Sequence, residues 1–467
     1  MACAVFGAIT YPGRDDGVLR DVWDKSVDRG RDYWGLMHFA RADSAITRYT
    51  SLADEEPDFA LGSGTWIGNR RAEPTTEWVH GATDVDVQPF TSPGGWTVAH
   101  NGTIANDKEL IALFSEMPGG YVPGSRIDSH AIAVALDALT ARYGSHEEAW
   151  DTAVRALRGS YAVLGVHSEA AHLLRYAANY KPLWACWLAS LDGGGVVVAS
   201  QRAYLPADDL WDPQPVVIPP YSIGHLSLTE GLVTTGTLYP DLSDNTLVVA
   251  SGGLDSTVAA CAVAARGDRV TLLHLQYGAK AQDREVQSVV ALGQQLGAEV
   301  VLLSTDFFRT AAPSSLTDAS VAIRTGFGGA EGAEYGHEWV PARNTVMLAL
   351  AAAYAEAHGH SRIVLGNNLE ESGGGYPDNE QEFINRWNDL LPYAVKPHTP
   401  VVIEQPLGAL MKHEIVALGA SLDAPFDLTW SCYSGGDKHC GTCGPCFMRR
   451  TAFEMNGLVD PVMEGVA

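Results

Sequence analysis

The chain has 467 residues, 46% of them hydrophobic and 19% charged, which is the composition of a packed globular protein. This length suggests about two to three domains, and we expect two. The formal net charge of -25, from 56 acidic and 31 basic residues, disfavours a general attraction to nucleic acid or to anionic membranes. A small-molecule substrate is therefore the simpler expectation.

The sequence shows no charged-then-apolar leader and no run near 18 consecutive apolar residues, so neither secretion nor membrane spanning is indicated. We expect a cytoplasmic protein without a membrane partner and without nucleic-acid binding, and a homodimer is compatible with the sequence.

The first half of the chain mixes the two kinds of hydrophobic pattern. Alternating apolar residues predict antiparallel strands at 96–104, 161–177 and 195–204, and helical spacing predicts helices at 129–144 and 146–159. From Ala199 to Ser243, short apolar pieces are separated by Pro, Gly and Asp. We therefore expect a layered α+β domain over residues 1–240 and a second domain over 241–467.

The second half reads differently. Short unbroken apolar strands at 246–250, 269–277, 299–307 and 362–368 alternate with helices from Ser256, at 284–297 and at 345–359. Strands without polar alternation are buried on both faces, so this order predicts an α/β doubly wound parallel sheet.

A glycine-containing loop follows the first of these strands, Ser251-Gly252-Gly253-Leu254-Asp255-Ser256-Thr257. Glycines let the backbone approach a phosphate, and the helix N-terminus that follows offers free amide groups to it. The string resembles the SGGxDS pyrophosphate-binding loop of ATP pyrophosphatases, which adenylate a carboxyl or carbonyl oxygen. The resemblance implies ATP binding at Ser251, Gly252, Gly253, Asp255, Ser256 and Thr257, an adenine nucleotide α-hydrolase-like fold, and Asp255 as a magnesium-associated acid.

Further strings resemble the 7-cyano-7-deazaguanine synthase family: "LQYGAKAQDRE", "VPARN" at 340–344, "GYPDNEQEF" at 375–383 and "PLGALMKHEI". Ala279 and Ala342 replace the family's Gln and Gly. A deazaguanine ring needs an aromatic or apolar slot, hydrogen-bonding groups for its edge, and cations near the phosphate charge. The resemblance implies a substrate site at Tyr277, Glu285, Arg343, Asn344, Tyr376, Asp378, Glu382 and Lys412, although singly each of these could be an ordinary surface, packing or turn residue.

Four of the seven cysteines, Cys432, Cys440, Cys443 and Cys446, fall within fifteen residues. In a reducing compartment such a cluster favours metal binding over disulfides. Four thiolates suit a closed, structural zinc site that braces the fold. An iron–sulfur cluster and paired disulfides are the alternatives, and the family resemblance favours zinc.

The first half resembles class II glutamine amidotransferases, in the order "CAVFG" from Cys3, "DRGRDYWG", "GNRRAEPT", "HNGTIAN", "IDSHAI" and "LRGSYAVLGV". This resemblance implies an αββα-layered, N-terminal-nucleophile hydrolase-like fold in which the Cys3 thiolate attacks glutamine. Asn101 and Gly102 would line the oxyanion hole. Arg71 would bind the α-carboxylate of glutamine, and Asp128 its α-amine.

That mechanism requires a free α-amine on the nucleophile, whereas removal of Met1 alone leaves Ala2 in front of Cys3. A displaced amine and a loss of glutaminase activity are alternatives. We favour further trimming that exposes Cys3.

Together the resemblances imply an enzyme that uses ATP, Mg²⁺ and glutamine to amidate 7-carboxy-7-deazaguanine through an adenylated intermediate, giving 7-cyano-7-deazaguanine or, further on, an amidine of the archaeosine type. A protein that attaches a deazaguanine to another protein, and an asparagine synthetase-like enzyme, are the competing hypotheses. We expect a free-base substrate.

Overall fold

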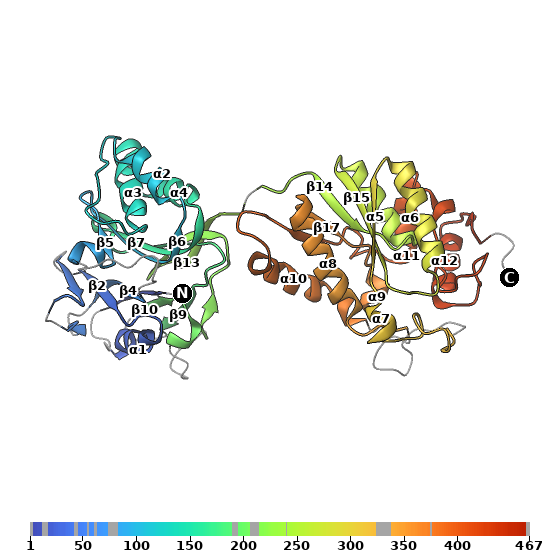
Figure 1. The fold of residues 1–467 in the computed structure, drawn as a ribbon, viewed down its shortest axis with the longest axis horizontal. Helices are drawn as coiled ribbons and strands as arrows, with labels where there is room; N and C mark the ends of the chain where they lie inside the picture. Colours follow the sequence, from blue (N-terminus) through green and yellow to red (C-terminus); the bar gives the residue numbers. More distant parts are fainter. Residues whose placement is uncertain are drawn as a thin grey trace. The chain divides into compact units, whose positions relative to one another are not determined.

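The structure is a computed structural model that describes residues 3–11, 17–41, 45–53, 56–59, 63–72, 83–188, 195–205, 214–239, 241–323, 338–373 and 376–463. The chain divides into two compact units, Met1–Tyr239 and Pro240–Ala467 (Figure 1). Met1, Ala2, residue 240 and Gly375 of the "GYPD" string lie outside the described residues. Among the described helices, none is long and apolar enough to cross a membrane.

The first unit is built on two antiparallel sheets. One has the order β11 (Val216–Val217), β9 (Trp184–Leu188), β10 (Gly195–Ala199), β1 (Ala4–Thr10), β4 (Gly64–Arg71), β2 (Tyr33–Ala40), β3 (Ile46–Thr50). The other has the order β13 (Gly231–Thr237), β12 (Ser222–Ser227), β8 (Leu174–Ala178), β7 (Gly159–His167), β6 (Trp96–Ile104), β5 (Phe90–Thr91). Side chains of both sheets, among them Val5, Ile67 and Leu164, form one buried cluster between them.

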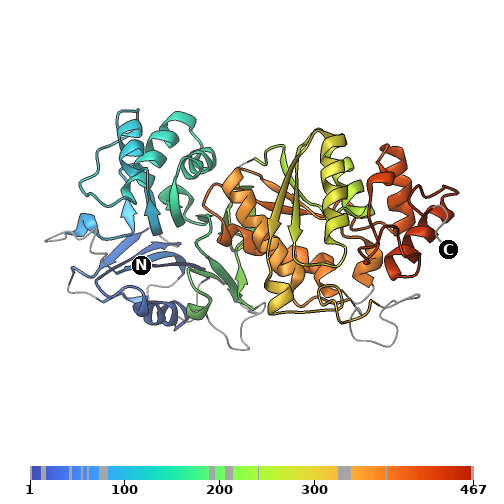
Figure 2. The same ribbon diagram turned by 45° about the vertical axis from the view of Figure 1, so that its right-hand side comes forward.

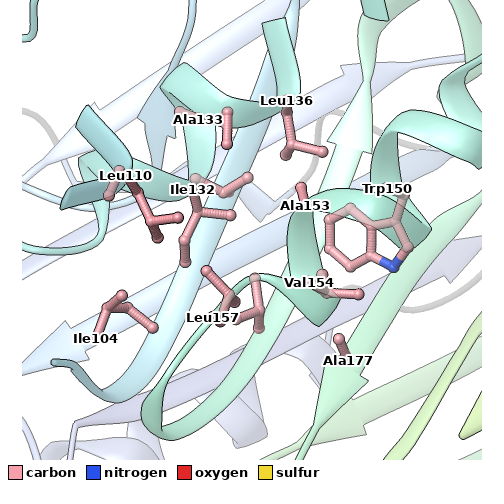
Figure 3. Close-up of a cluster of buried hydrophobic side chains, with 14 of the residues drawn as sticks. Ile104, Leu110, Ile132, Ala133, Leu136, Trp150, Ala153, Val154, Leu157 and Ala177 are labelled. Carbon is pink, nitrogen blue, oxygen red and sulfur yellow. The ribbon is translucent and has the colours of Figure 1, made fainter. Parts of the chain in front are cut away.

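Helices cover the outer faces of these sheets. Helices α2 (Asp107–Phe114), α3 (His130–Tyr143) and α4 (His146–Arg155) pack on the sheet that contains β6, through a buried cluster that includes Leu110, Ile132 and Trp150 (Figure 3). Helix α1 (Gly17–Lys25) packs on the other sheet through Leu19 and Val22. The expected αββα layering is confirmed.

The second unit contains a five-stranded parallel sheet. Its order is β16 (Glu299–Ser304), β15 (Arg269–Gln276), β14 (Asn245–Val249), β17 (Arg362–Val364), β18 (Val402–Glu404). From β14 the chain adds β15 and β16 on one side of the sheet, and then crosses back to add β17 and β18 on the other side. In such a sheet a crevice opens beyond the carboxyl ends of the strands, at the point where the order reverses.

Helices lie on both faces of this sheet (Figure 2). Leu272 of β15 packs with helices α5 (Leu254–Ala265), α6 (Gln282–Leu296) and α11 (Lys412–Ser421), whereas Leu273 packs with α8 (Arg343–His358) and α10 (Gln381–Ala394). The doubly wound fold is thus confirmed. Several element ends differ from expectation. Helix α5 begins at Leu254, before Ser256, and β16 ends at Ser304, since Phe307 begins helix α7 (Phe307–Thr310). Strand β17 ends at Val364, because residues 366–368 turn into the site described next.

Candidate active site

A cavity of about 250 Å³ opens at the carboxyl ends of β14, β15 and β17 in the second unit. Three chain segments that follow those strands contribute to its wall, together with the start of α8, the start of α11 and residues 430–433. Of the predicted site residues, the wall includes Ser251, Gly253, Asp255, Ser256, Tyr277, Glu285, Arg343, Asn344 and Lys412. The sheet therefore brings together residues up to 161 positions apart in the sequence, from 251 to 412.

The loop between β14 and α5 has the form that a phosphate site needs. Gly252 has φ +78°, and a Cβ at this position would lie 2.7 Å from the carbonyl oxygen of Glu285. The hydroxyl of Ser251 accepts a hydrogen bond from the amide of Gly253 at 3.2 Å and lies 3.1 Å from the hydroxyl of Ser256. The amide groups of the loop and of the α5 N-terminus make this an anion-binding end of the cavity. Thr257 is buried one residue further along α5, behind the cavity wall.

An ion pair lies beside this loop. The ammonium group of Lys412, the first residue of α11, contacts Oδ2 of Asp255, which also accepts from the side-chain amide of Asn368 at 3.2 Å. Burial lowers the pKa of Lys412, but attraction to Asp255 and Glu371 outweighs it and the pKa lies above its ordinary value. The lysine is therefore charged, and its ammonium group is paired with Asp255 at the cavity wall. Oδ1 of Asp255 is buried without a hydrogen-bond partner. A carboxylate oxygen in this state is suited to act as a ligand of a cation.

Glu371, in the short helix α9 (Leu369–Gly373), is a cavity residue that the motifs did not indicate. Its amide donates to Oδ1 of Asn368 at 3.0 Å, and its Oε2 accepts from the side chain of Asn379 at 3.4 Å. Burial raises the pKa of this carboxyl, and Lys412 opposes the shift. The carboxylate of the neighbouring Glu370 accepts a hydrogen bond from the backbone amide of Lys412 at 2.8 Å. Helix α9 therefore holds the backbone of Lys412 through Glu370 and favours its charged form through Glu371.

The second end of the cavity combines Tyr277, Glu285 and Arg343. Burial raises the pKa of Glu285 to about 7, with Arg343 opposing the shift, and burial also raises the pKa of Tyr277. Because the proton of Glu285 is lost near neutral pH, its carboxyl can either donate or accept a hydrogen bond. Ala342, which stands where the family has Gly, has φ +52° at the start of α8.

The described residues of the "GYPD" string, 376–378, lie next to the cavity but do not line it, whereas Asn379 directly after them does. The side chain of Asn344 donates to the carbonyl oxygen of Asp378 at 3.4 Å, and burial raises the pKa of the Asp378 carboxyl, opposed by Arg343. Tyr376 stacks on Trp339 with a centroid distance of 6.4 Å. Glu382 is placed away from the cavity, on the exposed side of α10, in an ion pair with Arg386 at 2.7 Å.

The four clustered cysteines form a candidate metal centre. Their sulfur atoms all lie within 4.8 Å of one another, the shortest separations are 4.0 Å, and none forms a disulfide. The amides of Ser434 and Cys440 each donate to the sulfur of Cys432 at 3.3 Å, which stabilises a thiolate. This donor set fits a tetrahedral ion held by four thiolates.

The predicted residues of the first unit gather where its two sheets face each other. Cys3 directly precedes β1, and since Ala4 pairs with Arg70, Cys3 and Arg71 are the next residues along two antiparallel strands. The side chain of Asn69 donates to the carbonyl oxygen of His100 at 3.0 Å and so ties β4 to β6, which carries Asn101 and Gly102.

The other sheet completes this group. Burial lowers the pKa of His100, Asp128 opposes the shift and Arg71 adds to it, so both predicted glutamine-binding charges lie near this ring. Oδ2 of Asp128 accepts from the amide of Ile104 at 2.7 Å. Gly102 has φ +137°, and a Cβ there would lie 1.9 Å from the carbonyl oxygen of Ser160, so only glycine fits. Oδ1 of Asn101 is buried without a hydrogen-bond partner.

Two family matches fall one in each unit. Residues 245–457 match the family described as Queuosine biosynthesis protein QueC, and residues 78–207 match a glutamine amidotransferase domain. A Sulfolobus acidocaldarius protein named 7-cyano-7-deazaguanine synthase is 40% identical over 451 residues, covering 95% of each chain. The chain belongs to the 7-cyano-7-deazaguanine synthase family.

Other family members differ in length. The 7-cyano-7-deazaguanine synthase of Saccharolobus solfataricus is 38% identical over 95% of this chain and 94% of its own. That of Koribacter versatilis is 44% identical over 223 residues, which are 46% of this chain and 91% of its own. Among solved structures, a glutamine phosphoribosylpyrophosphate amidotransferase from B. subtilis covers 95% of this chain with 12% identity and a TM-score of 0.40.

Both resemblances read from the sequence are confirmed, and the chain is an ATP-dependent ligase with an amidotransferase domain.

Within this 7-cyano-7-deazaguanine synthase family member, Glu371, His274, Trp430 and Tyr433 also line the cavity. Two acids following a strand in "RIVLGNNLEE" could have indicated Glu371, because the carboxyl ends of parallel strands converge. His274 lies inside an apolar strand, and Trp430 and Tyr433 flank a cysteine. No signal of sequence alone separates these three from core residues.

Proposed function

We propose that this enzyme converts 7-carboxy-7-deazaguanine to 7-cyano-7-deazaguanine with ATP and with nitrogen taken from glutamine. The substrate carboxylate attacks the α-phosphorus of ATP and pyrophosphate leaves. Ammonia then attacks the acyl carbon and AMP leaves, which gives the amide. The amide oxygen then attacks the α-phosphorus of a second ATP, pyrophosphate leaves and one N–H proton is lost. Loss of AMP with the remaining N–H proton gives the nitrile.

One observation carries this proposal: the anion-binding loop and the Tyr277–Glu285–Arg343 group line a single cavity. The amide groups around Ser251 and Gly253 would hold pyrophosphate, and Lys412 would stabilise the charge that develops on the α-phosphate. Glu285 and Tyr277 would meet the polar edge of the deazaguanine, and Arg343 would lie near its carboxylate.

A magnesium ion fits beside this loop. Oδ1 of Asp255, buried and without a hydrogen-bond partner, would be one ligand, and Glu371 supplies a second carboxylate nearby. When bound, the ion would neutralise charge on the departing pyrophosphate. At the four cysteines we propose zinc, with a structural role.

In the first unit, the Cys3 thiolate would attack the side-chain amide of glutamine and release ammonia. Its own α-amine would take the thiol proton once Met1 and Ala2 are removed. Asn101 and the amide of Gly102 would stabilise the oxyanion, Arg71 would bind the α-carboxylate, and Asp128 the α-amine. Mass analysis of the mature N-terminus tests the trimming, and an intact Ala2 in an enzyme that uses only ammonium would contradict it.

The decisive experiment is incubation of the protein with 7-carboxy-7-deazaguanine, ATP, Mg²⁺ and glutamine, followed by product mass. Accumulation of the nitrile supports the proposal. An amidine that forms while the nitrile is consumed would assign the later, archaeosine-type product, since the amidotransferase unit could supply that further nitrogen. No turnover of the free base would refute the free-base proposal, and a tRNA-borne substrate is then the next to assay.

A further inference from the structure

The segment that carries the first metal-binding cysteine also forms a wall of the active-site cavity. Trp430, Ser431 and Tyr433 line the cavity, while Cys432 between them is 1% exposed and belongs to the four-cysteine cluster. The proposed metal centre and the proposed nucleotide site are therefore separated by the thickness of one peptide segment. Metal binding at the cysteines would order this segment, and would therefore also order the part of the cavity wall that it forms.

Trp430 is joined directly to the phosphate loop. Its backbone amide donates to the carbonyl oxygen of Gly252 at 2.8 Å. A trans peptide is planar, so fixing the carbonyl of Gly252 also fixes the direction of the amide of Gly253 in the same plane. Gly253 lines the cavity, and its amide donates to the hydroxyl of Ser251 at 3.2 Å. The bond from Trp430 therefore helps to set the direction of an amide in the proposed phosphate loop.

Trp430 is in turn held by residues of the cysteine segment. Its indole N–H donates to the carbonyl oxygen of Cys432 at 2.8 Å. Its ring lies 4.3 Å from the ring of His439, the residue before Cys440, and Nε2 of His439 accepts from the amide of Ser431 at 3.2 Å. The side chain is thus supported from both ends of the stretch between the first two cysteines.

A second connection reaches the other wall of the cavity. The guanidinium of Arg284 lies 5.3 Å from the centroid of the Trp430 ring and bonds to the carbonyl oxygen of Gly436 at 2.9 Å and to Asp437 at 2.7 Å. Arg284 precedes Glu285 on α6, and the carbonyl oxygen of Glu285 lies against Gly252. The cysteine segment therefore contacts both the phosphate loop and the helix that carries a proposed substrate-binding acid.

We infer that Trp430 is a positioning residue that links metal occupancy at the four cysteines to the phosphate loop, so that metal and nucleotide bind cooperatively. At a four-thiolate site the free energy of metal binding is also free energy of ordering the segment. Coupling of two binding equilibria is reciprocal, so a nucleotide that needs the loop in place must also strengthen retention of the metal. This inference rests on the proposed use of ATP.

The test measures zinc release from the full-length zinc-loaded protein into a chromophoric chelator, with and without α,β-methylene ATP and Mg²⁺. Calorimetry first establishes that the analogue binds. We expect the analogue to slow zinc release about fivefold or more, which is the lower end of typical coupling between sites. Removal of zinc should weaken binding of the analogue by the factor by which the analogue raises the equilibrium affinity for zinc.

Trp430→Ala should retain zinc, bind the analogue more weakly, and release zinc at a rate that no longer responds to it. Both variants keep the backbone amide that bonds to Gly252. Trp430→Phe also keeps an aromatic ring beside His439 and Arg284, and should restore most of the response. Trp387→Ala removes another partly buried tryptophan of the same unit, on α10 and outside the cavity wall, and should keep the full response. A purely structural Trp430 would change zinc retention without changing its dependence on nucleotide.

The wild-type measurements alone can overturn the inference, even if the alanine variant does not fold. Binding of the analogue with an unchanged rate of zinc release overturns the coupling and leaves the proposed function in place. Failure of the wild-type protein to bind the analogue overturns both. A full nucleotide response in Trp430→Ala would overturn the assignment of the coupling to the Trp430 side chain.

Discussion

In the second unit, Asp255, Glu371 and Lys412 come from segments that follow three different parallel strands. In the first unit, Arg71 and Asn101 are themselves strand residues, in two sheets stacked face to face, and Cys3 directly precedes a strand. Charges in the first turns of separate helices can approach one another and pair, as Lys412 and Asp255 do in the second unit. Groups fixed by strand register cannot rearrange, and Oδ1 of Asn101 and Nε2 of His100 stay buried without hydrogen-bond partners. This contrast suggests that the site of the second unit can adapt around large substrates, whereas the site of the first unit is built to hold a small amide.

The largest effect should come from Lys412→Met, which removes the buried cation of the second unit. We expect the rate to fall about 10²- to 10³-fold with either glutamine or ammonium as nitrogen donor, since both routes need the adenylate. Product formation followed by chromatography measures this. Lys396→Met, at a side chain 79% exposed, is the control. Loss of the glutamine-dependent rate alone would contradict the placement of adenylation in the second unit.

Cys3→Ala should distinguish the role of the first unit, because it should affect the use of glutamine and not the use of ammonium. The glutamine-dependent rate should fall about 10³-fold or more, while the ammonium-dependent rate stays within about twofold, because only the nucleophile is lost. Cys186→Ala, at a buried cysteine of the same unit, should keep glutamine use. Equal loss with both donors would mean that the first unit is needed for more than ammonia supply.

Metal removal should destabilise one unit only. With a strong chelator, the calorimetric transition of the second unit should fall by about 10 °C or more, since several kcal/mol of folding free energy is lost and each kcal/mol is worth roughly 2–4 °C in a unit of this size. The transition of the first unit should not move. A shift of both transitions would show that the units unfold together.

A smaller effect is expected at the partly buried acid Glu285, which lines the cavity. Its pKa is raised to about 7 in the folded protein, so the folded state holds this proton more tightly than the unfolded state does. Its contribution to stability is therefore present at low pH and is lost as the pH rises through about 7. The difference in free energy of unfolding between Glu285→Gln and wild type should therefore be more favourable to the variant at pH 8 than at pH 5.5, by about 1–3 kcal/mol.

Denaturant unfolding of wild type and Glu285→Gln at the two pH values measures this difference. Glu382→Gln changes an exposed acid on α10 and should leave the pH dependence as it is in the wild type. A stability difference between Glu285→Gln and wild type that does not change with pH would contradict the raised pKa.

The smallest effect concerns backbone strain beside the cavity. Ala342 has φ +52°, a region that favours glycine. Ala342→Gly should stabilise the second unit by up to about 1 kcal/mol without changing the rate, as judged by denaturant unfolding. Destabilisation would indicate that the alanine side chain makes contacts worth more than the strain.

Most of the fold could be predicted from the sequence because its periodicities are local. The alternation at 96–104, the helical spacing at 129–144 and the apolar strands of the second half all correspond to described elements. The phosphate loop was also predictable, since its residues are consecutive and each has a local physical role.

The rest of the candidate site depends on packing between distant segments. Trp430 reaches Gly252 only because the cysteine segment folds back over α5 and α6, and a sequence pattern does not encode such a contact. Glu382 shows the converse, a motif residue that does not line the cavity. It shares a motif with Tyr376 and Asp378, but it lies after the turn into α10, where the helix directs it toward solvent and Arg386.

The bond between Asn69 and the carbonyl oxygen of His100 bridges the two stacked sheets of the first unit. The proposed nucleophile Cys3 directly precedes a strand of one sheet, and the proposed oxyanion-binding residues belong to the other sheet. Their alignment therefore depends on how far one sheet can slide over the other. The bulk of Val5 and Leu164 in the shared interior resists that sliding. A cavity made deep in this interior would thus impair glutamine hydrolysis without touching a single catalytic group.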